Sequence, residues 1–130
     1  MKPFASSLGI RHLVCGSCNA CEHEMNALAG PDYDITSRGW EIVASPRHAD
    51  IVTVSGPMTE PMRQPAHDTL DAVARPRIVV AIGDCAVGTG AWSRNGSGAG
   101  TELHAAIDVP GCPPSPEAII EGIAAAAEML

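Results

Sequence analysis

The chain has 130 residues, 45% of them apolar but only 3% aromatic, and a formal net charge of −7. A single domain of this length buries a core without disulfides. Its eight Lys and Arg residues are scattered, which argues against direct binding to nucleic acid or an anionic membrane surface. No run approaches the roughly 18 apolar residues of a membrane span, and the first residues lack the apolar core of a signal peptide.

Strand and helix signals alternate along the chain. Runs of apolar and β-branched residues predict strands at 12–15, 40–44, 50–56, 77–83 and 105–109. Helices are predicted at 18–28, 60–74 and 116–129, the last with Ser115 as its N-cap and Pro116 at its first position. This alternation in a short chain predicts one α/β domain over residues 1–130 with a doubly wound parallel sheet.

The five cysteines follow the predicted strands. Three of them lie in VCGSCNACEHEM, residues 14–25, after the first strand; Cys85 follows the strand at 77–83, and Cys112 follows the strand at 105–109. The carboxyl ends of parallel strands meet at one edge of a sheet. All five thiols are therefore expected at that edge. Five is an odd number, and we expect a cytoplasmic chain in which thiols stay reduced, so metal binding is favoured over disulfides.

Two kinds of metal group suit such thiols. Structural zinc is usually held by compact cysteine pairs, whereas an iron–sulfur cluster accepts cysteines from separate loops. The glycines beside the thiols favour the cluster, because they let the backbone approach its sulfurs. A redox Cys-x-x-Cys pair within residues 15–21 stays open, although it leaves Cys85 and Cys112 unexplained. Cys15 also fits a buried small hydrophobe.

Four segments resemble one known family. GSCNACEHEM, VASPRHADIVTVSGPMTEPM, VVAIGDCAVGTG and VPGCPPSPEAIIEGI are similar to the small electron-transfer subunit of membrane-bound [NiFe] hydrogenases and formate hydrogenlyase. The 20 kDa subunit of NADH:quinone oxidoreductase (complex I) belongs to the same family. The similarity covers residues 10–122, and the Cys-x-x-Cys spacing follows the hydrogenase branch rather than the adjacent cysteines of complex I.

The resemblance implies a flavodoxin-like fold with one [4Fe–4S] cluster on Cys18, Cys21, Cys85 and Cys112, and leaves Cys15 without a ligand role. It implies an electron relay that has no turnover alone. Its partners would be the large catalytic subunit of a hydrogenase-like complex and a ferredoxin-like electron-relay subunit. Those partners would keep it peripheral on the cytoplasmic face of the membrane. The alternatives are a quinone-reducing 20 kDa-type subunit, a zinc-stabilised α/β binding module, and a scaffold that has lost its cluster.

Several other residues carry narrower expectations. Glu22 and Glu24 are expected at an exposed helix start, where acidic side chains favour the helix dipole. Glu24 also matches a family glutamate, which leads to the hypothesis of a proton-transfer role. Met58 and Met62 are expected as adaptable contacts at a subunit interface. The remaining expectations are negative or local: no metal role for His12, His23, His67 and His104, loop capping for Arg47 and His48, and no phosphate-binding loop at 88–100, because no Lys-Ser/Thr follows its glycines.

Overall fold

The computed structural model describes residues 7–90 and 96–130. Its centre is a five-stranded sheet in the order β2-β1-β3-β4-β5, with each neighbouring pair parallel. The strands are β1 (Leu8–Val14), β2 (Trp40–Ile42), β3 (Ile51–Ser55), β4 (Ile78–Ile82) and β5 (Ile107–Val109). The predicted doubly wound parallel sheet is thereby confirmed.

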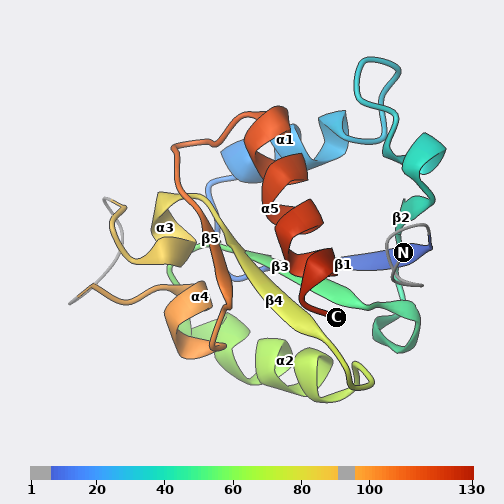
Figure 1. The fold of residues 1–130 in the computed structure, drawn as a ribbon. Coiled ribbons are helices and arrows are strands. Elements are labelled where there is room, and N and C mark those ends of the chain that lie inside the picture. The colour runs from blue at the N-terminus through green and yellow to red at the C-terminus, as the bar shows by residue number, and fades with distance from the viewer. Residues whose placement is uncertain (1–6, 91–95) are drawn as a thin grey trace.

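Helices cover both faces of this sheet (Figure 1). One layer holds α1 (Ala20–Ala27) and α5 (Pro116–Glu128), and the other holds α2 (Glu60–Asp71), α3 (Asp84–Val87) and α4 (Ala99–Glu102). Two short 3-10 helices, η2 (Ile35–Arg38) and η3 (Pro46–His48), flank β2. Among the helices of the described ranges, none combines the length and the apolar character needed to cross a membrane.

Each face of the sheet buries its own apolar cluster. One cluster packs α1 and α5 onto Leu8, Ile10, Ile51, Val80 and Ile82; the other packs α2, α3 and α4 onto Leu13, Val52, Val54, Val79 and Ala81. β3 is buried along its whole length, as expected of a central strand with helices on both sides. The two-sided core explains why aliphatic residues dominate and aromatic ones are few.

The predicted elements are found, with shifted ends. β1 begins at Leu8 rather than at residue 12, because Leu8 and Ile10 are also buried against α1 and α5. α1 begins at Ala20 rather than at residue 18, because Asn19 is left-handed with a φ of 78°. The four-residue helices α3 and α4 escape prediction, since one helical turn carries no hydrophobic period.

Candidate metal centre

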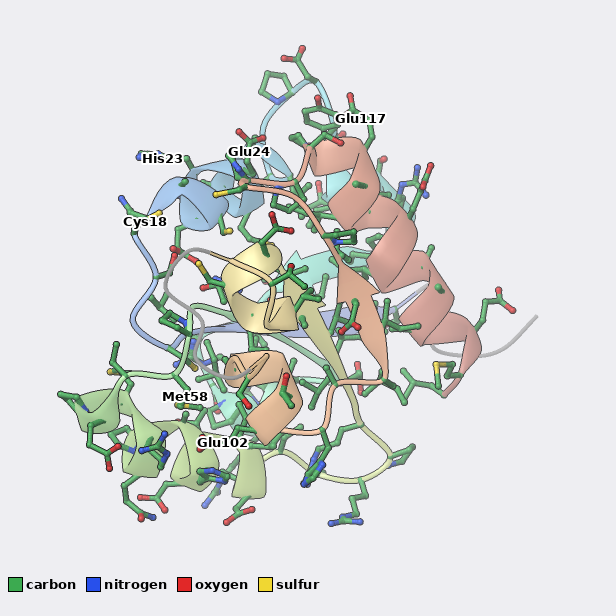
Figure 2. All side chains as sticks on the ribbon, turned by 90° about the vertical axis from the view of Figure 1, so that its left-hand side faces the viewer. Cys18, His23, Glu24, Met58, Glu102 and Glu117 are labelled. Carbon is green, nitrogen blue, oxygen red and sulfur yellow. The ribbon has the colours of Figure 1, made fainter. Side chains whose placement is uncertain are left out.

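Four cysteines come together at the carboxyl edge of the sheet. Cys18 and Cys21 follow β1, Cys85 lies in α3 directly after β4, and Cys112 follows β5. None of the five cysteines forms a disulfide. Figure 2 shows Cys18 beside the start of α1, at the end of the molecule where these loops gather.

The pKa of the Cys21 thiol is affected by its burial and by the cysteines around it. Burial raises the pKa of its thiol to about 12, and the negative charges of Glu22, Cys18, Cys85 and Cys112 add to the rise. Nearby charges shift a pKa in this way, so the other three thiols belong to the electrostatic surroundings of Cys21. A bound cation would reverse this balance, because a metal stabilises the thiolate that its neighbours disfavour.

Glycines shape the space around two of these thiols. A Cβ added to Gly83 would lie 2.6 Å from the sulfur of Cys21, and one added to Gly90 would lie 2.9 Å from the sulfur of Cys85. Gly83 also has a φ of 88°, which side-chain-bearing residues rarely adopt. The backbone therefore approaches both sulfurs more closely than any other residue would allow.

Cys15 takes no part in this group. It is fully buried in the cluster beneath α2, α3 and α4, on the face opposite Cys21. Burial raises the pKa of its thiol to about 11, with Glu102 and Glu22 contributing. The expected edge position of Cys15 is correct, but its side chain behaves as a small hydrophobe.

The four cysteines offer a donor set made of thiolates alone. Within the described ranges, 7–90 and 96–130, no three His, Cys, Asp or Glu side chains converge closely enough to hold one metal ion. Single zinc requires four ligands within about 2.3 Å of one point. Four cysteine thiolates are also the usual ligand set of a [4Fe–4S] cluster.

Glu22 corrects one expectation. Instead of lying exposed at the helix start, it is only 9% exposed and receives hydrogen bonds from the hydroxyls of Ser17 and Ser55. Its Oε2 also lies 2.7 Å from Nε2 of His12. Burial opposes ionisation, but these hydrogen bonds outweigh it and lower the pKa of the carboxyl to about 2. Glu24, by contrast, is half-buried on α1.

His12 belongs to this buried group, a role that the sequence did not suggest. Its Nδ1 lies 2.7 Å from Oγ1 of Thr53, so the ring bridges two strands and α1. The signal that could have revealed it is the presence of polar residues inside otherwise apolar strands, at His12 in β1 and at Thr53 and Ser55 in β3. Because a polar group buried without a partner is unfavourable, such positions indicate a buried network.

A cavity of about 680 Å³ opens beside Cys18. Its lining comes from the loops after β1 and β3, the first turn of α2 and the chain around α4: Gly16, Cys18, Pro57, Met58, Thr59, Glu60, Arg63, Ser97, Gly98 and Glu102. Arg63 forms ion pairs with Glu60 and Glu102, and Glu102 also contacts His67. Any molecule bound there would contact a wall that contains one of the four thiols.

The other residues singled out in the sequence lie in several parts of the fold. Met58 is buried, with a left-handed φ of 64°, so it is not the exposed contact expected, whereas Met62 is half-buried. Arg47 and His48 are exposed in η3, which Ser45 caps. Part of the glycine-rich segment 88–100 lies outside the described residues.

The fold is that of a small parallel α/β protein with four cysteines in the loops at the carboxyl edge of its sheet. Residues 18–126 match the model of the family described as NADH ubiquinone oxidoreductase, 20 Kd subunit, and the chain belongs to that family. The expected family membership is thereby confirmed.

Relatives from both branches of the family resemble the chain. It is 39% identical to a probable membrane-bound hydrogenase subunit of Pyrococcus furiosus, over 92% of this chain and 73% of that one. It is 40% identical to a subunit of the NADH-quinone oxidoreductase of Clostridium beijerinckii, over 79% of this chain and 63% of that one. A chain of the membrane-bound sulfane sulfur reductase, an archaeal respiratory membrane complex, superposes with a TM-score of 0.77 at 27% identity, covering 97% of this chain and 71% of that one.

Proposed function

We propose that the chain carries one [4Fe–4S] cluster on Cys18, Cys21, Cys85 and Cys112 and relays electrons within a hydrogenase-type oxidoreductase complex. The observation that supports this proposal is that the four cysteines lie in loops that follow β1, β4 and β5 at one edge of the sheet. Family membership supports it, because the relatives are subunits of hydrogenase and quinone oxidoreductase complexes.

The residues suit an electron relay. When bound, the cluster accepts and returns single electrons. Four cysteines would occupy every iron position that a protein ligates, so no open position would remain for a substrate, and the chain alone would have no turnover. Cys18 and Cys112 are exposed, whereas Cys21 is buried. A cluster held this way would lie at the surface, where electrons can pass to a neighbouring subunit.

The expected neighbours are a large catalytic subunit and a ferredoxin-like relay subunit. The exposed edge with Cys18 and the cavity beside it would face the catalytic subunit. Attachment to a membrane would then pass through partner subunits, on the cytoplasmic face. The names of the hydrogenase and sulfane sulfur reductase relatives, which both belong to membrane-bound complexes, support this arrangement.

A quinone-reducing subunit is the second candidate. The cavity beside Cys18 favours it, because a small ligand there would lie next to the electron carrier. The spacing of Cys18 and Cys21 favours the hydrogenase branch, in which two residues separate the first two ligands. Reduction of a soluble quinone by the assembled complex, in the absence of hydrogen oxidation, would select the quinone branch.

Glu24 is proposed as a proton-transfer residue of the assembled complex. It lies on α1 three residues after Cys21 and is half-buried. Glu24→Gln should lower proton-coupled turnover of the complex and leave reduction of the cluster by dithionite intact. Unchanged proton-coupled turnover in this variant would refute the proton-transfer role of Glu24.

The cluster itself is tested in the full chain. Anaerobic purification should give about four irons and four sulfides per chain, with an electron paramagnetic resonance (EPR) signal after dithionite reduction. Cys85→Ser should lose iron and signal. Cys15→Ala, which removes a buried thiol from the opposite face of the sheet, should keep both.

Three results would contradict the proposal. Zinc in place of iron would identify the zinc-stabilised binding module, and a wild-type chain that takes up neither metal under reconstitution with iron and sulfide would identify the cluster-free scaffold. Loss of iron in Cys15→Ala, with retention in Cys85→Ser, would refute the ligand assignment.

A further inference from the structure

One face of the sheet packs against α1 and α5. On this face the strand residues change from apolar to polar toward the carboxyl edge. Ile10 and Ile51 are paired across β1 and β3 and fully buried in the apolar cluster. The next pair on the same face is His12 with Thr53, followed by Ser55. Thr53 and Ser55 are as fully buried as the isoleucines before them. The apolar row therefore becomes polar only where it passes beneath the loop that carries Cys18.

Glu22 contacts His12 and Ser55 of this polar row. Its Oε2 accepts a hydrogen bond from the hydroxyl of Ser55 and lies 2.7 Å from Nε2 of His12, while its Oε1 accepts from the hydroxyl of Ser17. Ser17 Oγ in turn accepts a hydrogen bond from the backbone N–H of Asn19, at 3.2 Å. One carboxylate thus joins two strands to the segment on either side of Cys18.

This arrangement is unfavourable unless it is complete. A buried carboxylate needs charge-assisted hydrogen bonds to offset its desolvation, and a donor left without its acceptor costs about 1–3 kcal/mol. Aliphatic residues at these positions would continue the apolar row and give a simpler core. The network instead includes Ser17 and Glu22, which are the chain neighbours of Cys18 and Cys21.

From this geometry we propose that Glu22 is a positioning residue. It holds the segment 17–21 against β1 and β3 and so fixes the sulfurs of Cys18 and Cys21 for the cluster. That this restraint serves cluster binding rests on the proposed function. The restraint on segment 17–21 itself depends only on the hydrogen bonds of the chain and is present before any cluster binds. Within residues 7–90 and 96–130, Glu22 is the side chain whose hydrogen bonds join Ser17 to both strands.

Three substitutions separate the length of the side chain from its charge. Glu22→Gln keeps the length and one acceptor oxygen, Glu22→Asp keeps the charge but is one methylene shorter, and Glu22→Ala removes both. Glu121→Ala, an exposed acidic position on α5, is the matched control. Hydrogen–deuterium exchange of peptides that cover 16–22 is measured in the metal-free full chain, with far-ultraviolet circular dichroism to check the fold.

We expect exchange at 16–22 to rise about tenfold or more in Glu22→Ala, less in Glu22→Asp, and least in Glu22→Gln, with Glu121→Ala unchanged. After reconstitution, iron per chain should fall in the same order, and the reduced EPR signal should broaden as the thiolates lose their fixed positions. If Glu22→Ala unfolds the whole chain, the proposal is tested by the other two variants, in which exchange at 16–22 should be faster in Glu22→Asp than in Glu22→Gln. Exchange and EPR signals equal to wild type in all three variants would overturn the proposal.

The two proposals fail in different ways. A wild-type chain that binds no iron refutes the cluster, yet the exchange comparison in the metal-free chain still shows whether Glu22 restrains 16–22. Four irons in every Glu22 variant, with wild-type exchange and spectra, refute the positioning role and leave the electron relay intact.

Discussion

Gly83 allows a direct test of how closely the backbone approaches the proposed ligands. Gly83→Ala places a Cβ 2.6 Å from the sulfur of Cys21, and the next atom, the carbonyl oxygen of Gly111, is 3.5 Å away. The backbone at Gly83 has φ 88° and ψ 160°, a region that costs a non-glycine residue about 1–3 kcal/mol. Forcing an extra methyl into a packed site costs about 1–3 kcal/mol more.

The summed destabilisation of Gly83→Ala is about 2–6 kcal/mol. With a urea dependence of about 2 kcal/mol per molar, within the usual range for a small protein, the unfolding midpoint should fall by roughly 1–3 M. The assay is urea unfolding of the metal-free chain, followed by circular dichroism. The displaced thiol should also reduce iron content after reconstitution.

A double-mutant cycle isolates the clash with the thiol. Adding Cys21→Ala removes the atom that the new Cβ meets, so the double variant should recover about 1–2 kcal/mol relative to the sum of the single changes. Gly96→Ala is the control for backbone strain alone, since Gly96 has a φ of 71° and no atom within 4 Å of the added Cβ; it should cost about 1–2 kcal/mol. A cycle without coupling, or a Gly83→Ala chain as stable as wild type, would refute the proposed close approach.

Three further predictions concern the rest of the fold. Ile123→Ala, at a fully buried position on α5, should destabilise the chain by about 2–5 kcal/mol in the same urea assay. Burial alone would raise the pKa of Glu102, but hydrogen bonds from His67 and Arg63 outweigh it and lower that pKa, so the stability it contributes is present at neutral pH and is lost in acid. Glu102→Gln should therefore be less stable than wild type at neutral pH, and the difference should shrink by about pH 3, below the ordinary pKa of a glutamate; an undiminished difference would contradict this. Ser115→Ala should lower the free energy of unfolding by about 0.5–2 kcal/mol, because the Ser115 hydroxyl accepts a hydrogen bond from the first turn of α5. An unchanged thermal midpoint would refute this capping role.

The sheet could be predicted from sequence because its strands are buried on both faces. β4 is a continuous apolar run, and β3 is fully buried with only Thr53 and Ser55 interrupting its aliphatic residues, as is typical of central parallel strands. The position of the cysteine loops then followed from topology alone, since loops after parallel strands share one edge. That reasoning located Cys85 and Cys112 near the first cysteines without any knowledge of distances.

The buried network could not be predicted in the same way. Its members His12 and Thr53 are 41 residues apart in sequence and meet only through the register of β1 and β3. Glu22 and Glu24 look alike in a helix of eight residues, and only packing decides which of them faces the sheet. The separation of Cys15 from the other thiols likewise depends on which face of β1 its side chain follows.

The order of the strands has a consequence for how the protein matures. Cys18 and Cys21 lie in the first quarter of the chain, whereas Cys112 follows β5, which pairs only with β4 at the edge of the sheet. The four thiols are therefore not assembled until the last strand has paired, and such long-range parallel pairing is slow to form. A newly synthesised chain would expose separate reactive thiols throughout this interval. For the proposed cluster, delivery of iron and sulfide would follow folding, and protection of these cysteines from oxidation would precede it.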